Sequence, residues 1–276
     1  MSPAGPIYVE LSRRLRAGAP LALATITEID PEQAQAAGGV RLGAKLLVEP
    51  PDVRLGELGV EELDHVVERD ARAALERGTT VTRHYGLRGE ARRRDVSVFI
   101  EVFAPPPRLV IFGAVDFTAA LASVGRLLGF RVTVCDARPV FATKARFPMA
   151  DEVVVDWPDR YLMSIASELG PRDAVCVLTH DTKFDVPAVL VSLRTEVGYL
   201  GAMGSRRTHE ERWRRLVEAG ADEKALEERL MSPIGLDIGA RTPEETAVAI
   251  AAEIIAARAG VATPSLKDAS GPIHRH

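Results

Sequence analysis

Residues 197–207 and 233–241 combine glycines with charged side chains in a way that suits an anionic ligand. The first segment reads VGYLGAMGSRR and the second reads PIGLDIGAR, and a helix is expected to begin at each. Glycine lets a backbone approach a ligand closely, and a helix N-terminus offers unpaired N–H groups and partial positive charge. The segments therefore predict a site for a phosphorylated small molecule. The candidate contacts are Gly201, Gly204, Ser205, Arg206, Arg207, Gly235, Asp237 and Arg241.

Each of these residues also has a purely structural interpretation. Ser205 is placed to cap the helix that follows it, and Arg206 and Arg207 fit solvated positions or ion pairs with acidic neighbours. Cations at a helix N-terminus cost a few tenths to about 1 kcal/mol, which favours a compensating anion there. The second segment fits ligand binding and a tight turn equally well, because a capping-box pattern follows at 242–245.

A nucleotide-binding turn is expected after the apolar run 108–112. Such turns need the pattern G-x-G-x-x-G or G-x-G-x-x-A, but residues 113–118 read GAVDFT, so that only Gly113 remains of it. Val115 replaces the glycine that lets the backbone reach a pyrophosphate, and Asp116 adds negative charge where phosphates would lie. The sequence therefore predicts that any NAD(P) binding is weakened.

Polar residues follow two further predicted strands. Asp136 stands where a ribose-binding acid belongs in dinucleotide-binding folds, and a turn-forming aspartate is the alternative. Arg138 fits contact with a 2′-phosphate or with solvent. The run Thr179, His180 and Asp181 fits a ligand contact, or a structural turn of low specificity. We assign no catalytic residue and no metal ligand from the sequence.

The candidates share one position relative to the predicted secondary structure. Residues 108–260 alternate apolar strand runs with helices, which predicts a Rossmann-like, doubly wound parallel sheet. The predicted strands are 108–112, 131–135, 152–155, 173–178 and 196–200, with a helix at 186–194. The candidates near residues 113, 136, 179–181 and 201–205 follow strand carboxyl ends, where such sheets bind their ligands.

Three consecutive prolines at 105–107 are expected to form a linker between two domains. Before them, residues 1–104 predict a smaller α+β domain with strands at 21–29, 45–48, 80–83 and 95–103 and a helix at 61–77. After the Rossmann-like domain, the polar tail 261–276 is expected to be flexible. The predicted fold class is α/β.

Composition excludes several function classes. The net charge of −4 is spread over interspersed signs, which argues against a nucleic-acid partner. No apolar run approaches the roughly 20 residues that span a bilayer, and the N-terminus lacks a signal-peptide core, so we expect a cytoplasmic location. Cys135 and Cys176 lie in apolar runs and are expected to be buried and unpaired.

Several long motifs occur in order after residue 108. They are FRVTVCDARPVFATKARFPMADEVVVDWP, VLTHDTKFDVPAVL, GYLGAMGSRRTHEERWRRL and PIGLDIGARTPEETAVAIAAEI. With them the chain resembles the XdhC/CoxI family, accessory proteins of xanthine dehydrogenase and carbon monoxide dehydrogenase type molybdoenzymes. The N-terminal part resembles the family's smaller domain weakly, through LALATI and GAKLLVEP.

The resemblance implies binding of the molybdenum cofactor, molybdopterin, its protection and sulfuration, and its delivery to an apo-enzyme. It implies an accessory protein rather than a catalyst. The expected partners are a client molybdoenzyme of the xanthine dehydrogenase family and a cysteine desulfurase. The alanine-rich helix at 247–257 adds a possible homodimer contact.

Two departures from the family pattern fall on ligand-contacting positions. The family's GSVSGGCVE stretch corresponds to residues 55–62, which contain no cysteine, and its GAGHVAQ turn is replaced by GAVDFTA. The sequence therefore leaves three functions open. These are a molybdenum cofactor chaperone, an NAD(P)-binding oxidoreductase, and a non-catalytic interaction module that has lost its ligand.

Overall fold

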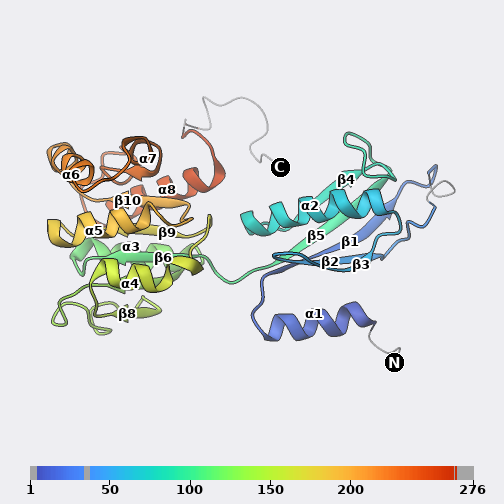
Figure 1. The fold of residues 1–276 in the computed structure, drawn as a ribbon, viewed down its shortest axis with the longest axis horizontal. Coiled ribbons are helices and arrows are strands. Elements are labelled where there is room, and N and C mark those ends of the chain that lie inside the picture. Colours follow the sequence, from blue (N-terminus) through green and yellow to red (C-terminus); the bar gives the residue numbers. More distant parts are fainter. Residues whose placement is uncertain (1–4, 34–37, 264, 266–276) are drawn as a thin grey trace. The chain divides into compact units, whose positions relative to one another are not determined.

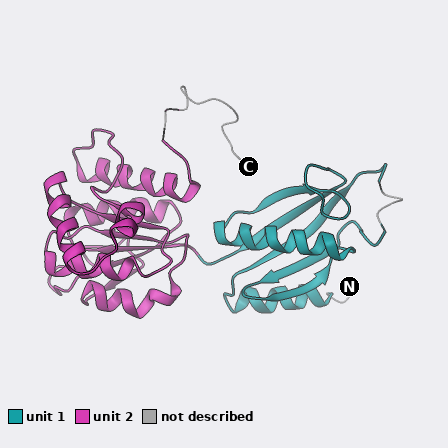
Figure 2. Ribbon diagram, turned by 45° about the horizontal axis from the view of Figure 1, so that its top comes forward, with its two compact units in different colours: residues 1–105 teal, residues 106–276 magenta. Residues whose placement is uncertain are grey.

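The computed structural model describes residues 5–33, 38–263 and 265, and the chain forms two compact units. The first unit comprises Met1–Pro105 and the second Pro106–His276, so the division falls within the proline run (Figure 2). Most of the tail predicted over 261–276 lies outside the described residues.

The first unit is an antiparallel sheet with one helix packed on a face. Its strand order is β3-β2-β1-β5-β4. The strands are β1 (Leu21–Ile29), β2 (Lys45–Glu49), β3 (Val53–Glu57), β4 (Val81–Tyr85) and β5 (Val96–Phe103). Helix α2 (Glu61–Arg77) buries Leu63, Val67 and Ala71 against alternate residues of the central strands, while α1 (Pro6–Arg16) buries none of its residues. Strand β3 occupies part of the segment that the sequence left without an assigned element.

The second unit is a parallel sheet, as predicted, but it has six strands, because β11 adds to the five that the sequence indicated (Figure 1). Its order is β11-β10-β9-β6-β7-β8. The strands are β6 (Arg108–Phe112), β7 (Arg131–Cys135), β8 (Glu152–Val154), β9 (Ala174–Val177), β10 (Tyr199–Ala202) and β11 (Leu230–Met231). The helices are α3 (Asp116–Leu127), α4 (Pro158–Ile165), α5 (Thr182–Ser192), α6 (Arg206–Glu218), α7 (Glu223–Arg229) and α8 (Pro243–Ala259), with a short 3-10 turn at Ala166–Glu168.

Both faces of this sheet are covered by helices. On one face Leu109 and Ile111 of β6 pack with residues of α3 and α8, and on the other Val110 and Phe112 pack with residues of α4 and α5. Burial on both faces explains why the strands are continuous apolar runs. The chain runs from β6 out to β8 and returns to β9 on the other side of β6, so the topological switch point lies between β6 and β9.

Two elements begin three or more residues away from their predicted starts. The strand expected at 196–200 is observed as β10, three residues later, because pairing with β9 begins at Tyr199 opposite Ala174. The helix expected at 186–194 begins at Thr182, because Asp181 caps it. The helices within the described ranges do not combine the length and apolar character that a bilayer crossing requires.

Candidate functional site

A pocket of about 520 Å³ lies at the carboxyl ends of the strands that flank the switch point. Its walls come from the turn after β6, the turn after β7 and the turn after β9. The lining residues are Val115, Arg138, Thr179, His180, Asp181 and Thr182. This is the position where open α/β sheets bind their ligands.

Gly113 follows β6 and lies close to the backbone at the end of β9. Its φ is +109°, and a Cβ on it would stand 2.8 Å from the backbone nitrogen of Thr179. A larger residue would therefore have to push the ends of β6 and β9 apart. The close approach explains why this one glycine of the nucleotide-turn pattern is retained.

Asp136 is buried behind the pocket with only 3% of its surface exposed. Its carboxylate accepts hydrogen bonds from the Ala114 N–H at 2.7 Å and the Arg138 N–H at 2.9 Å, and from Arg138 Nε and Nη2 at 2.9 and 2.7 Å. Burial opposes ionisation of Asp136, but the hydrogen bonds from Arg138 and Ala114 outweigh it and lower the pKa. A carboxylate has about four acceptor positions, so the geometry favours the turn-forming interpretation of Asp136 over ribose binding.

The same contacts fix the guanidinium of Arg138 at the pocket. The hydrogen bonds to Asp136 raise the pKa of Arg138 and hold its guanidinium plane. The guanidinium lies 4.6 Å from the ring centre of Phe141, and Arg146 lies 5.5 Å from that ring. Phe141 and Arg146 were not predicted as site residues, although both lie in the family motif that spans residues 130–158.

The turn after β9 holds Thr179, His180 and Asp181 as predicted neighbours. Thr179 is buried, whereas His180 and Asp181 are exposed. The Asp181 carboxylate accepts from the Lys183 N–H at 3.2 Å as the N-cap of α5, and its other oxygen lies 3.2 Å from Lys183 Nζ. Across the ranges that the structure describes, no group of three or more His, Cys, Asp or Glu residues could hold a metal ion.

The altered turn still presents a helix N-terminus. Helix α3 begins at Asp116, after Val115, and no side chain caps it. The carboxylate of Asp116 is 91% exposed and lies 4.0 Å from Arg146. Arg146 therefore offsets part of the negative charge that the sequence places at this turn.

The glycine-rich segment 197–207 is buried within β10 and becomes exposed at the start of α6. Gly201 lies inside β10, and a Cβ on it would stand 2.5 Å from Ile234, so packing accounts for this glycine. Gly204 has φ +156° and a Cβ there would meet Thr208 at 2.9 Å. Ser205 caps α6 by accepting from the Thr208 N–H at 3.2 Å.

The two arginines at the start of α6 differ in their contacts. Arg207 pairs with Glu211 at 3.1 Å. The Arg206 side chain is exposed and has no ion pair or hydrogen bond with any residue that the structure describes. Of the pair, Arg206 is the better candidate for contact with an anion.

The 233–241 segment is held to α8. The Gly235 N–H donates to Glu253 Oε2 at 2.8 Å, and the same oxygen accepts from the Tyr199 hydroxyl at 2.5 Å. Asp237 is exposed, and the Arg241 N–H donates to Glu245 at the capping box of α8. The pocket lining thus contains Arg138, Thr179, His180 and Asp181 of the predicted residues, and none from 201–241.

The fold defines the second unit as a Rossmann-like domain with a pocket at its topological switch point. The chain belongs to the XdhC family, because residues 109–254 match the XdhC Rossmann domain. A solved xanthine dehydrogenase structure from Bacillus halodurans shares this fold, with a TM-score of 0.50 and 23% identity over 96% of this chain and 98% of that chain.

Three curated proteins are similar in sequence. Identity is 36% over 169 residues with a probable xanthine dehydrogenase subunit of Bacillus subtilis, covering 61% of this chain and 48% of that protein. Identity is 27% with Escherichia coli YqeB, covering 90% of this chain and 46% of that protein. It is 26% with the E. coli molybdenum cofactor insertion chaperone PaoD, covering 56% of this chain and 42% of that protein. The aligned part is therefore less than half of each of these relatives.

Proposed function

We propose that this protein binds the molybdenum cofactor and delivers it to a molybdoenzyme of the xanthine dehydrogenase type. Membership of the XdhC family and similarity to a molybdenum cofactor insertion chaperone support the proposal. The observation that carries it is the pocket at the switch point, where Asp136 fixes the Arg138 guanidinium beside Thr179 and His180.

The pocket residues fit the chemistry of a phosphorylated pterin. Arg138 supplies a fixed cation for the phosphate, and the uncapped N-terminus of α3 adds partial positive charge. Thr179 and His180 supply hydrogen-bonding groups at the pocket wall. When bound, the cofactor would contribute its molybdenum to the client's chemistry, while the residues of this chain bind and orient it.

Sulfur for the cofactor comes from a partner in this proposal. Cys135 and Cys176 are both buried. Burial raises the pKa of the Cys135 thiol to about 12 and raises that of Cys176 as well, so neither thiol is set up as a sulfur carrier. We infer that a cysteine desulfurase supplies the sulfur as a partner of this protein.

Retention of freshly released molybdenum cofactor tests the proposal. The protein is mixed with the cofactor and ultrafiltered, and the retained pterin is oxidised and measured by fluorescence. We expect retention near one cofactor per chain, and a loss of about tenfold or more in affinity for Arg138→Ala, since it removes a charged hydrogen-bond donor. Arg214→Ala, an exposed arginine on α6, is the matched control.

The outcomes separate the function from the site. Absence of retention by the wild-type protein contradicts the function. Normal retention by Arg138→Ala would show that the site lies elsewhere, and the double variant Arg206→Ala, Arg207→Ala then tests the start of α6.

Thermal unfolding with NAD and with NADP tests the oxidoreductase alternative, because ligand at 100 times its dissociation constant adds about 2.7 kcal/mol of stability. Stabilisation by either nucleotide, without pterin retention, would favour the oxidoreductase alternative.

A further inference from the structure

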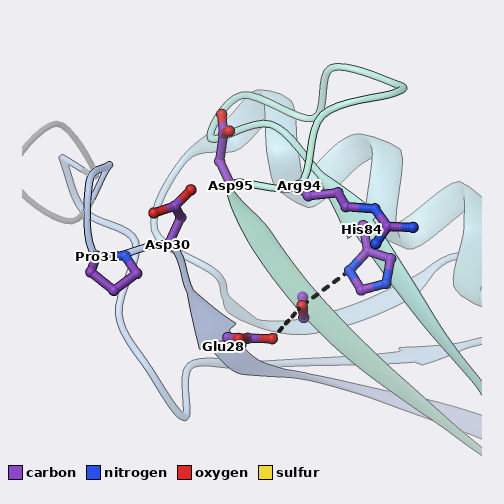
Figure 3. A pocket seen from close by; sticks show the side chains of 7 residues that line it. Glu28, Asp30, Pro31, His84, Arg94 and Asp95 are labelled. Atoms are coloured by element: carbon purple, nitrogen blue, oxygen red, sulfur yellow. Dashed lines mark hydrogen bonds between the residues drawn. The ribbon is translucent and has the colours of Figure 1, made fainter.

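A second pocket, of about 250 Å³, lies on the sheet of the first unit (Figure 3). Three of its residues form a row across neighbouring strands: Glu28 of β1 pairs in register with Ser97 of β5, which pairs with His84 of β4. An irregularity between Ile26 and Glu28 shifts the register of β1, and this shift brings Glu28 opposite Ser97. Neither the predicted function nor the family motifs involve these residues.

The hydrogen bonds along this row have one direction. Ser97 Oγ lies 3.1 Å from Glu28 Oε2 and 3.0 Å from His84 Nδ1. An ionised carboxylate only accepts, so Ser97 donates its single proton to Glu28 and accepts from Nδ1–H of His84. In the imidazole tautomer with its proton on Nδ1, the lone pair lies on Nε2, which can accept a hydrogen bond. Because the Ser97 proton is directed to Glu28, His84 is not placed to activate this hydroxyl as a nucleophile.

The remaining lining residues bring charges of both signs. Arg94 and His84 are drawn on one side of the pocket in Figure 3, and Asp30 and Asp95 on the other. Arg94 has no ion pair or hydrogen bond with the residues described in the structure. Asp95 Oδ2 is buried without a hydrogen-bond partner in the same set of residues, and it forms an ion pair with Arg93 Nη1 at 3.6 Å.

These groups are complementary to a small ligand with two opposite charges. The guanidinium of Arg94 matches a carboxylate, and the carboxylate of Asp95, which also lines the pocket, matches an ammonium group. The free Nε2 of His84 accepts a further N–H or O–H. We propose that this pocket binds a free amino acid, with its carboxylate at Arg94 and its ammonium at Asp95.

Saturation-transfer NMR with each of the twenty standard L-amino acids tests the assignment on the full chain. The strongest binder is then titrated by calorimetry, beside acetate and methylammonium, which each carry only one of the two charges. We expect at least one amino acid to bind with a dissociation constant below about 10 mM, and acetate and methylammonium to bind about tenfold more weakly or not at all.

Variants locate the site. Arg94→Ala is expected to weaken binding about tenfold or more, and Ser97→Ala to weaken it by breaking the row that fixes His84. Arg92→Ala removes the same charge from the same exposed loop, outside the pocket lining, and is expected to bind like the wild type. Circular dichroism confirms that each variant is folded.

Three results would overturn the proposal: no amino acid binds, acetate or methylammonium binds as tightly as the amino acid, or Arg94→Ala binds like the wild type. The proposal is independent of the molybdenum cofactor, because both pocket and variants lie in the first unit and the assay contains no pterin.

Discussion

The carboxylate of Asp136 is ionised although it is buried, because hydrogen bonds from Ala114 and Arg138 replace the water that it loses. One residue thereby ties the turn after β6 to the turn after β7 and fixes the cation at the pocket. Folding lowers the pKa of Asp136, so its ionised form stabilises the fold above the ordinary value of 3.8. That contribution is lost as the pH falls through the lower value in the folded protein.

Because folding lowers the pKa of Asp136, the stability that is lost in Asp136→Asn should depend on pH. At neutral pH we expect the variant to be less stable than the wild type by about 1–3 kcal/mol, since charged hydrogen bonds are lost. The difference in unfolding free energy between the wild type and the variant should become smaller as the pH falls below 3.8 and the wild-type carboxyl is protonated. Urea unfolding at several pH values measures both stabilities. Asp237→Asn, at an exposed loop position, is the control, and an equal loss in both variants would contradict the role given to Asp136.

At the scale of elements, helix α6 is anchored by a buried ion pair. Arg212 and Asp185 are each 2% exposed, and Arg212 Nε lies 3.1 Å from Asp185 Oδ2. Arg212 also donates to the carbonyl of Met203 at 2.7 Å and to Ser232 Oγ at 3.2 Å. One guanidinium thus joins α6 to α5, to the end of β10 and to the segment before 233–241. It positions the start of α6, where Arg206 lies.

Breaking this pair should cost far more than breaking an exposed pair on the same helix. Asp185→Asn leaves a buried guanidinium without its counter-charge, and we expect a loss of about 3–5 kcal/mol in the free energy of unfolding. Glu211→Gln removes the exposed partner of Arg207 and should cost no more than about 1 kcal/mol. Chemical denaturation measures the unfolding free energy of both variants. Similar losses would show that the buried pair contributes no more to stability than the exposed pair.

At the scale of the whole molecule, each unit has its own hydrophobic core. The cluster under α2 contains only residues before the proline run, and the two clusters on the faces of the parallel sheet contain only residues after it. Apolar burial is the main driving force of folding, so each unit has its own source of stability.

We therefore expect residues 106–276 to fold without the first unit. The isolated segment should show helical circular dichroism and a cooperative thermal transition. If it remains unfolded, or unfolds without cooperativity while the full chain unfolds cooperatively, the second unit depends on the first for its stability.

The sequence by itself determined the parallel sheet. Continuous apolar runs separated by helices indicate strands buried on both faces, and the XdhC family motifs lie on this part of the chain. It also indicated that the residues near 113, 136 and 179 meet, because the carboxyl ends of parallel strands share one edge.

Only the tertiary structure decided what these residues contact. Local pattern does not reveal that Ile234 fills the space beside Gly201, since the two are 33 positions apart in the chain, or that the Asp136 carboxylate already accepts hydrogen bonds from Ala114 and Arg138. It does not reveal the row of Glu28, Ser97 and His84 either, because strand register joins positions up to 69 residues apart. Periodicity specifies which face a side chain takes, whereas pairing and packing between distant segments specify its neighbours.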